Sequence, residues 1–246
     1  MQRKSKIILC AVTALLIAAA MFALYQVWSE LRQRKQEQDD FHALAEMTEL
    51  PNEEVADDAD IVPHHDVWEL WSMNPDCVGW LSIPDTVVDY PVMQNADEPQ
   101  KYLHRDFNGN YSYAGVPFLD RRCMPESHNW IIYGHNMNDG TMFGCLKRYL
   151  EDGFLAEHPV MYYETKDGIA AYEIIAIATV SKNDSWYQFL RRATAEDYAA
   201  GIQELLGKAQ ITTGVCPDFG DALLTLSTCQ GGNRDSRLLV VGVRQP

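Results

Sequence analysis

A cysteine and an arginine stand at facing ends of two apolar runs near the end of the chain. The run ALLTLSTC ends at Cys229, and RLLVVGV begins at Arg237 after a polar loop that contains glycine. If the two runs pair as a hairpin, the thiol and the guanidinium lie together at one end of a sheet. A nearby cation favours the nucleophilic thiolate, and the backbone N–H of Gln230 would then be an oxyanion donor. A free buried cysteine beside a surface arginine fits the same residues, so this stretch alone leaves both interpretations open.

A histidine follows another predicted strand. The run WIIY, residues 130–133, leads to Gly134, His135 and Asn136 and then to a loop rich in Asn, Asp and Gly. Because imidazole titrates near neutral pH, a histidine displayed where a strand ends is a candidate general acid or base. A structural or solvent-facing histidine also fits this context.

Composition and charge exclude several classes of function. The formal net charge of −15 provides no basic surface that would neutralise phosphates, so we expect no nucleic-acid partner. Six cysteines without a CxxC spacing, in a chain of 246 residues, do not indicate a disulfide framework. The seven histidines are scattered and the chain has no glycine-rich phosphate loop, so we expect neither a metal site nor a cofactor.

The N-terminal residues have the pattern of a membrane anchor. Residues 7–28 are 22 positions without a charge, and as a helix they would be about 33 Å long, enough to cross a bilayer core. Arg3, Lys4 and Lys6 precede this span and favour a cytoplasmic N-terminus. A cleaved signal peptide is the alternative, since the small residues 18–20 would suit cleavage.

The charge pattern divides the chain into three parts. Residues 1–36 are interpreted as a cytoplasmic tip followed by a signal-anchor transmembrane helix. Residues 37–66 hold eleven Asp/Glu and no Lys/Arg, a composition that resists collapse and indicates an acidic stalk. Tryptophans and short apolar runs begin at Val67, so residues 67–246 are predicted to form the folded domain, outside the cell on a single-pass anchor.

Many short strands with few helices favour a barrel or a sandwich over βαβ winding in this domain. The predicted strands cover residues 79–83, 87–90, 116–119, 130–133, 160–164, 170–180, 222–228 and 237–243. The predicted helices cover residues 67–74, 141–149 and 194–208. The last of these begins TAEDY, with the acidic residues of a helix N-terminus in its first turn.

The order of histidine, cysteine and arginine, each at the edge of a strand, resembles the sortases and in detail their class B. The similarity covers about residues 67–243 and rests on NPDCVGWLSIPDTVVDYPVMQ, KYLHRDF, GVPFLD, YGHN with DGTMF, and TLSTC followed by RLLVV. The helix-bearing insertion at residues 181–210 distinguishes class B from the smaller class A. The resemblance implies a mainly β fold: a closed eight-stranded sortase-type β-barrel with N-terminal helices and a helix-bearing insertion before the nucleophile strand.

The resemblance also implies an activity, that of a membrane-anchored cysteine transpeptidase, a thiol endopeptidase of the Gram-positive cell surface. Such an enzyme would cleave a C-terminal sorting motif, NPxTx- or xPxTG-like, of secreted proteins through a thioester on Cys229. It would then transfer them to an amine of a peptidoglycan precursor or cross-bridge. The catalytic set would be His135, Cys229 and Arg237. The residues that map near the substrate groove are Leu103, Tyr133, Ser181, Trp186 and Ser227.

Other classes of protein share parts of this pattern. A sortase that joins pilins would use the same residues with a different amine. L,D-transpeptidases also place an arginine close behind the cysteine, but their nucleophile follows a Ser-x-Gly element, which Ser227-Thr228-Cys229 lacks. Papain-like peptidases place the cysteine before the histidine, the reverse of the order here. A non-catalytic membrane-anchored surface binding protein would carry an inert Cys229.

Overall fold

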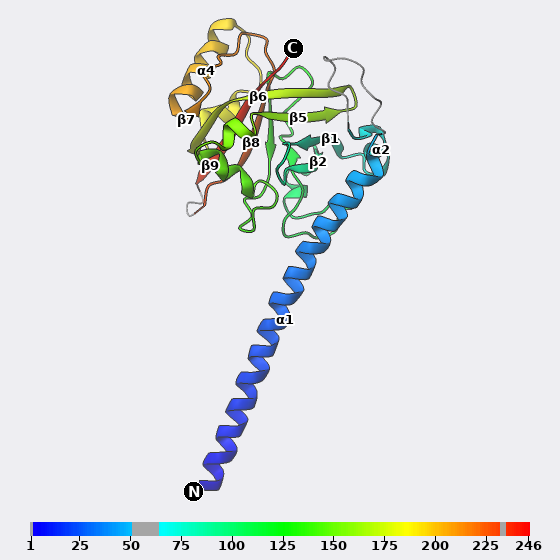
Figure 1. The fold of residues 1–246 in the computed structure, drawn as a ribbon, viewed down its shortest axis with the longest axis vertical. Helices are drawn as coiled ribbons and strands as arrows, with labels where there is room; N and C mark the ends of the chain where they lie inside the picture. Colours follow the sequence, from blue (N-terminus) through cyan, green and yellow to red (C-terminus); the bar gives the residue numbers. More distant parts are fainter. Residues whose placement is uncertain (1, 51–63, 232–234) are drawn as a thin grey trace. The chain divides into compact units, whose positions relative to one another are not determined.

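The computed structural model describes residues 2–50, 64–231 and 235–246, and the chain divides into two compact units, Met1–Leu44 and Ala45–Pro246. The described residues of the first unit are all part of helix α1 (Gln2–Thr48), drawn in blue in Figure 1. Among the described residues, α1 holds the stretch that is long and apolar enough to cross a membrane, a property that signal sequences share. The predicted stalk is helical as far as Thr48, and its residues 51–63 lie outside the described residues.

The second unit is built on a closed barrel of eight strands. Its hydrogen-bonded order is β5-β1-β2-β3-β4-β8-β9-β6, and β6 pairs back with β5 to close the ring. The strands are β1 Cys77–Ser82, β2 Asp89–Met93, β3 Phe118–Leu119, β4 Asn129–Tyr133, β5 Val160–Thr165, β6 Gly168–Ser181, β8 Leu223–Cys229 and β9 Ser236–Arg244. This ring confirms the predicted eight-stranded barrel, and each predicted strand is present with its ends shifted by a few residues at most (Figure 1).

A ninth strand, β7 (Ala209–Thr212), pairs with β6 outside the ring. The sequence did not predict it, because its four residues directly follow a helix and alternate only weakly between half-buried and exposed side chains. The segment Gly144–Leu150 differs too, since it is the 3₁₀ helix η2 and not part of an α-helix. The other helical elements are α2 Val67–Met73, η1 Lys101–Leu103, α3 Phe154–Glu157, η3 Ser185–Gln188 and α4 Ala195–Lys208.

The insertion between β6 and β8 contains η3, α4 and β7, as the predicted helix-bearing insertion requires. Thr194 caps α4 by accepting a hydrogen bond from the backbone N–H of Asp197 at 3.2 Å. The buried face of α4 follows helical spacing and consists of Tyr198, Gly201, Ile202 and Leu205. At Gly201 a Cβ atom would lie 2.1 Å from the ring of Phe189, so only glycine lets the helix approach η3 this closely.

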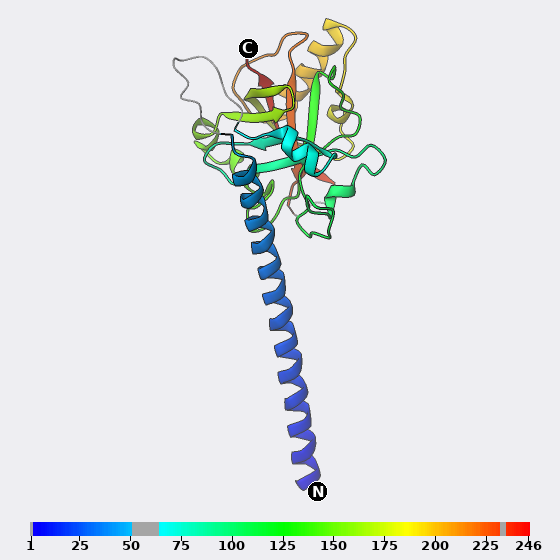
Figure 2. The ribbon, with the colours of Figure 1, turned by 90° about the vertical axis from the view of Figure 1, so that its right-hand side faces the viewer.

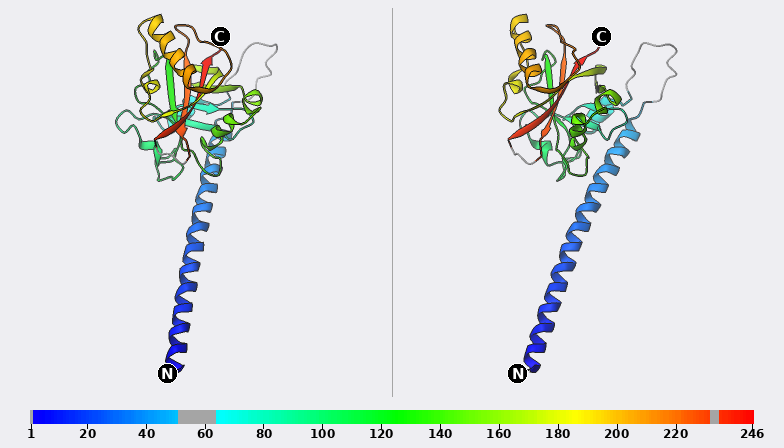
Figure 3. Two further views of the ribbon diagram at one scale, coloured as in Figure 1. Left: turned by 90° about the vertical axis from the view of Figure 1, so that its left-hand side faces the viewer. Right: turned by 60° about the vertical axis from the view of Figure 1, so that its left-hand side comes forward.

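Strand β8 lies inside the sheet, between β4 and β9. It runs parallel to β4 and antiparallel to β9 (Figures 2 and 3). Its first six residues are buried and its last, Cys229, is exposed. Because β8 is covered on both faces and hydrogen-bonded on both edges, its backbone is held firmly where the chain leaves the core.

A buried carboxylate fastens the start of the folded domain to the barrel. Glu164 of β5 is 1% exposed, and its Oε2 accepts hydrogen bonds from the backbone N–H groups of His64 and His65, both at 2.8 Å. Its Oε1 lies 2.9 Å from Nδ1 of His65, whose ring stacks on Trp80 at 4.2 Å. A carboxylate buried this deeply is stable only with such partners.

Glu164→Ala should lower the free energy of unfolding by about 3 kcal/mol, because it leaves two buried donors of His65 and the N–H of His64 without an acceptor. Thermal unfolding of the detergent-solubilised full chain would measure the change. Glu157→Ala, at an exposed position on α3, is the control and should cost less than about 0.5 kcal/mol. Equal melting temperatures for the two variants would contradict the role assigned to Glu164.

Candidate active site

Cys229 and Arg237 are partners across a β-hairpin. They pair in register as the last residue of β8 and the second of β9. Near the connecting loop, the backbone N–H of Gln230 donates to the carbonyl of Ser236 at 3.0 Å. The Arg237 guanidinium also donates through Nη1 to the Ser236 carbonyl, at 3.0 Å. The hairpin expected from the sequence therefore places a thiol and a guanidinium side by side at one end of the sheet.

Hydrogen bonds between β4 and β8 bring the histidine loop to the same end of the sheet. The Thr228 hydroxyl donates to the carbonyl of Gly134 at 2.7 Å, and Asn136 Nδ2 donates to the carbonyl of Cys229 at 2.6 Å. His135 lies between these two anchored residues of its own loop. Gly134 is required by space, since a Cβ there would lie 2.6 Å from the ring of Phe143.

The tautomer of His135 follows from its hydrogen bond. Its Nε2 lies 2.8 Å from the carbonyl oxygen of Leu103, which can only accept, so Nε2 carries the hydrogen and Nδ1 can receive a proton. Burial lowers the pKa of His135, the bond to Leu103 opposes this shift, and the nearby ring of His104 lowers the pKa further. The resting imidazole is therefore mainly neutral at pH 7 and able to act as a base.

The three residues of the predicted catalytic set line one groove of about 590 Å³. Six of the nine predicted site residues are among its lining: Leu103, Tyr133, His135, Ser227, Cys229 and Arg237. A cleft of this size that is lined by a thiol, an imidazole and a guanidinium can hold an extended peptide beside a nucleophile.

The remaining three predicted residues lie elsewhere. Trp186 is 4% exposed, donates from Nε1 to the hydroxyl of Thr225 at 3.1 Å and stacks on Phe189, so it packs the insertion onto the barrel. Ser181 is exposed at the end of β6. The backbone N–H of Gln230, which was expected to stabilise an oxyanion, is instead hydrogen-bonded within the hairpin.

The neighbours of Trp186 line the groove in its place. Tyr187 and Gln188 are both groove residues, and the Tyr187 hydroxyl is hydrogen-bonded to that of Ser227 at 2.8 Å. The sequence missed them because η3 is a single irregular turn, in which no periodicity shows which of three consecutive side chains points inward. Tyr133 and Tyr187 are stacked, with ring centroids 6.1 Å apart.

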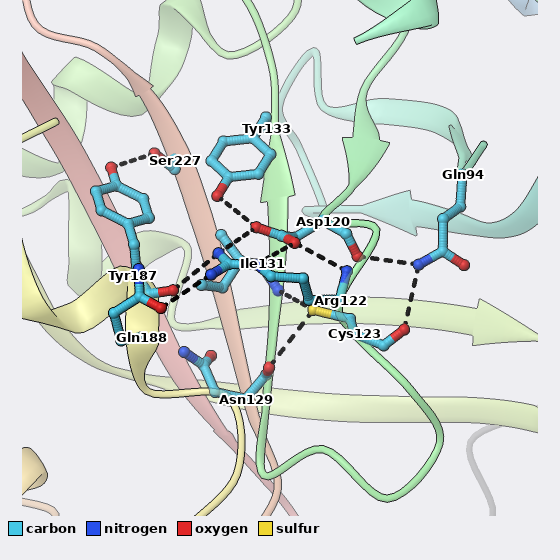
Figure 4. A network of polar contacts seen from close by, with 10 residues as sticks. All are labelled: Gln94, Asp120, Arg122, Cys123, Asn129, Ile131, Tyr133, Tyr187, Gln188 and Ser227. Atoms are coloured by element: carbon cyan, nitrogen blue, oxygen red, sulfur yellow. Dashed lines mark hydrogen bonds and ion pairs between the residues drawn. The ribbon is translucent and has the colours of Figure 1, made fainter. Parts of the chain in front are cut away.

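An ion pair between the buried Asp120 and the more exposed Arg122 forms part of the groove wall (Figure 4). Arg122 donates from Nε to Asp120 Oδ1 at 2.9 Å and from Nη2 to Asp120 Oδ2 at 2.8 Å, a bidentate pair. The same guanidinium donates to the carbonyl of Tyr187 at 2.9 Å and to Oε1 of Gln188 at 3.0 Å. It thereby joins η3 of the insertion to the turn after β3.

The charge state of this wall is fixed by its hydrogen bonds. Burial would raise the pKa of Asp120, but the bonds from Arg122 and from the Tyr133 hydroxyl, the latter at 2.9 Å, outweigh it and lower the pKa below its ordinary value. Burial and the Asp120 carboxylate together raise the pKa of Tyr133. Asp120 is thus a carboxylate and Tyr133 a neutral hydroxyl donor at neutral pH. Asp120 is the last residue of the segment GVPFLD, but no local pattern in the sequence indicates its role in the wall. The insertion residues that Arg122 contacts, Tyr187 and Gln188, lie far along the chain.

Comparison with known proteins agrees with this geometry. The family model of the sortase domain matches residues 81–245. Sortase B of Listeria monocytogenes is 34% identical over 232 residues, which cover 89% of this chain and 88% of the relative. The Staphylococcus aureus sortase B–substrate complex has a TM-score of 0.73 at 25% identity, covering 87% of this chain and 98% of that one. A sortase B structure complexed with triglycine has a TM-score of 0.67 at 28% identity, covering 72% and 84%.

A closed barrel with a cysteine, a histidine and an arginine at one groove is the architecture of a cysteine transpeptidase. The chain belongs to the sortase family. The relatives named above are all of type B, which confirms the class expected from the sequence.

Proposed function

We propose that this chain is a membrane-anchored sortase that cleaves a C-terminal sorting motif, NPxTx- or xPxTG-like, of secreted proteins and transfers them to an amine of a peptidoglycan precursor or cross-bridge. The observation that carries the proposal is the meeting of Cys229, His135 and Arg237 at one groove of a sortase barrel. Two of the related sortase B structures are a substrate complex and a triglycine complex, which supports a peptide substrate and an amine acceptor.

The chemistry follows from the position of each proton. Nδ1 of His135 takes the thiol proton of Cys229, and the thiolate attacks the amide carbonyl of the sorting motif. The imidazolium then returns this proton to the departing amine, which leaves a thioester on Cys229. An incoming amine attacks the thioester while neutral His135 takes its proton, and the thiolate leaves and is reprotonated. A new amide bond replaces the one that was cleaved.

Arg237 takes no part in proton transfer, because a guanidinium is not a proton donor or acceptor in reactions near neutral pH. Its proposed role is to hold the substrate backbone and to stabilise the negative charge that develops on the attacked carbonyl oxygen. The backbone N–H of Gln230 already donates to the carbonyl of Ser236, so it could stabilise the oxyanion only if that bond opened. This makes Arg237 the more important donor in the proposed mechanism. Leu103, Tyr133 and Ser227 are proposed to contact the sorting peptide from the groove wall.

The proposed anchor is the apolar part of α1. Side chains at 11–28 are almost all exposed although they are mostly apolar, and a helix that is apolar on all sides is stable in a bilayer rather than in water. We propose residues 1–36 as tip and anchor with a cytoplasmic N-terminus, 37–66 as the acidic stalk and 67–246 as the extracellular catalytic domain. Protease treatment of intact protoplasts should then remove the catalytic domain; a protected domain would contradict this topology.

The activity is tested by mass spectrometry. The full chain in detergent is incubated with peptides that carry NPxTx or xPxTG motifs, with triglycine and a lysine-containing pilin peptide as competing amines. Transfer to triglycine supports the proposal, and transfer to the lysine peptide alone would make the chain a pilin-joining enzyme. Failure to cleave any peptide, with the fold intact, would favour the non-catalytic binding protein instead.

A further inference from the structure

The groove has the opposite charge to the domain that contains it. Residues 67–246 include 14 Lys/Arg and 23 Asp/Glu, a net charge of −9. The groove lining nevertheless includes four cations and one acid, namely Arg121, Arg122, Lys182, Arg237 and Asp120. A concave site with an excess of one charge attracts ligands of the other sign. The groove therefore favours a peptide that carries negative charge.

Three of the four cations already have assigned partners or roles. Arg122 is neutralised by Asp120 within the wall. Lys182 pairs with Asp235 at 2.7 Å, an ion pair between two exposed side chains. Arg237 belongs to the proposed catalytic set. Arg121 is different, because its guanidinium makes no hydrogen bond or ion pair with any of the described residues.

The turn that carries Arg121 is held rigidly. The backbone N–H of Arg122 donates to Asp120 Oδ1 at 2.9 Å, and the N–H of Cys123 donates to the carbonyl of Asp120, also at 2.9 Å. Gln94 Nε2 donates to that same carbonyl at 2.9 Å (Figure 4). A side chain on a fixed turn loses less backbone entropy when it binds a ligand, so Arg121 is preorganised at the groove.

The register of the strands places Arg121 away from the reacting atoms. Phe118 of β3 pairs with Tyr133 of β4, and the backbone N–H of Asp120 donates to the carbonyl of Ile131 at 2.8 Å, four residues before His135; Arg121 begins the turn just beyond this bond. At about 3.4 Å per residue these four residues span roughly 14 Å, and Arg121 lies one residue beyond them, at the length of about five residues of an extended peptide. The part of the substrate N-terminal to the attacked carbonyl must stay bound through both chemical steps, whereas the C-terminal part leaves after the first. We therefore assign the N-terminal part to the stretch of groove between His135 and Arg121.

We propose that Arg121 is a specificity residue that binds an acidic side chain of the sorting peptide, about five residues N-terminal to the attacked carbonyl. This inference rests on the proposed function and names the chemistry of its substrate. The planar guanidinium would hold a carboxylate through two parallel hydrogen bonds. Because the site is open to solvent, the expected preference for an acidic residue is modest, at most about fivefold.

The test scans charge along the peptide. Peptides of one cleavable motif carry Glu, Gln or Lys at single positions from roughly three to seven residues before the attacked carbonyl, and kcat/KM is measured with the full chain at low and high salt. Glu should exceed Gln by about fivefold at one position near the fifth, Lys should be worse than Gln, and salt should reduce the difference. Arg121→Gln should process the Glu and Gln peptides equally, and Arg121→Glu should reverse the preference toward Lys.

Arg191→Gln is the matched control. It removes the same charge from an exposed arginine that lies outside the groove and pairs only loosely with Glu126, at 3.6 Å, so the preference for Glu should persist. Binding of the same peptides to the Cys229→Ala variant, followed by fluorescence anisotropy, reports the preference without turnover. An absence of cleavage overturns the proposed function. Equal affinity for the Glu, Gln and Lys peptides, or a preference that survives in Arg121→Gln, overturns the role of Arg121.

Discussion

Cys229→Ala should reduce cleavage of a sorting peptide to the background rate and abolish the thioester, while the melting temperature stays almost unchanged. The chemical loss is complete because no other group in the groove replaces a thiolate as the attacking atom. The structural cost is small because Cys229 is the exposed last residue of β8 and leaves no cavity when its sulfur is removed. Peptide-cleavage kinetics and mass spectrometry of the trapped acyl-enzyme measure the first effect, and thermal unfolding the second.

The other described cysteines provide the controls. Burial raises the pKa of Cys77 and of Cys123 to about 12 and that of Cys145 to about 11, so these three are protonated thiols at neutral pH. Their replacement by Ala should leave activity largely intact and lower stability only. Cys216 is the closest match because it is also exposed, and Cys216→Ala should change neither property. A substrate thioester on any of these four would contradict the mechanism.

The β-hairpin at the active site could be predicted because its signals are local. The second strand is an apolar run and the first alternates apolar residues with Thr and Ser, and the polar loop between Cys229 and Arg237 separates the two. A strand that ends in a polar residue shows from sequence alone where the chain leaves the core. The residues of the predicted catalytic set lie at the ends of predicted strands, and the alternation of side chains locates such ends well. These are the residues that the structure brings to one groove.

The groove wall could not be predicted because it depends on contacts between distant segments. Asp120 and Arg122 are near neighbours in sequence, but nothing local shows that their ion pair reaches the backbone of Tyr187, 65 residues further on. Which residue of η3 lines the groove is hard to predict for a related reason, because a single 3₁₀ turn has no periodicity that separates an inward from an outward side chain. The engaged N–H of Gln230 likewise depends on how tightly the hairpin closes.

Arg237→Lys should lower kcat/KM by roughly 10²-fold, comparable to the loss of one oxyanion-hole donor. The lysine keeps the positive charge beside Cys229, so any loss measures the planar fork of the guanidinium and not its charge. Arg237 faces Cys229 in register and lines the groove, which is where a donor to the developing oxyanion must lie. Arg237→Ala should be worse still. Both variants should alkylate at Cys229 with a small reagent, because the thiol itself remains.

Arg244 provides a control on the same strand. It is the last residue of β9, exposed and paired in register with Tyr172, at the opposite end from the active site. Arg244→Lys should therefore leave peptide cleavage unchanged, which shows that the exchange of arginine for lysine on β9 is harmless in itself. Arg234 lies in the loop between Cys229 and Arg237, outside the residues that the structure describes, and should tolerate Ala. Full activity of Arg237→Lys together with an inactive Arg234→Ala would transfer the proposed role to the loop arginine, because the fork would then be needed at position 234 and not on the strand.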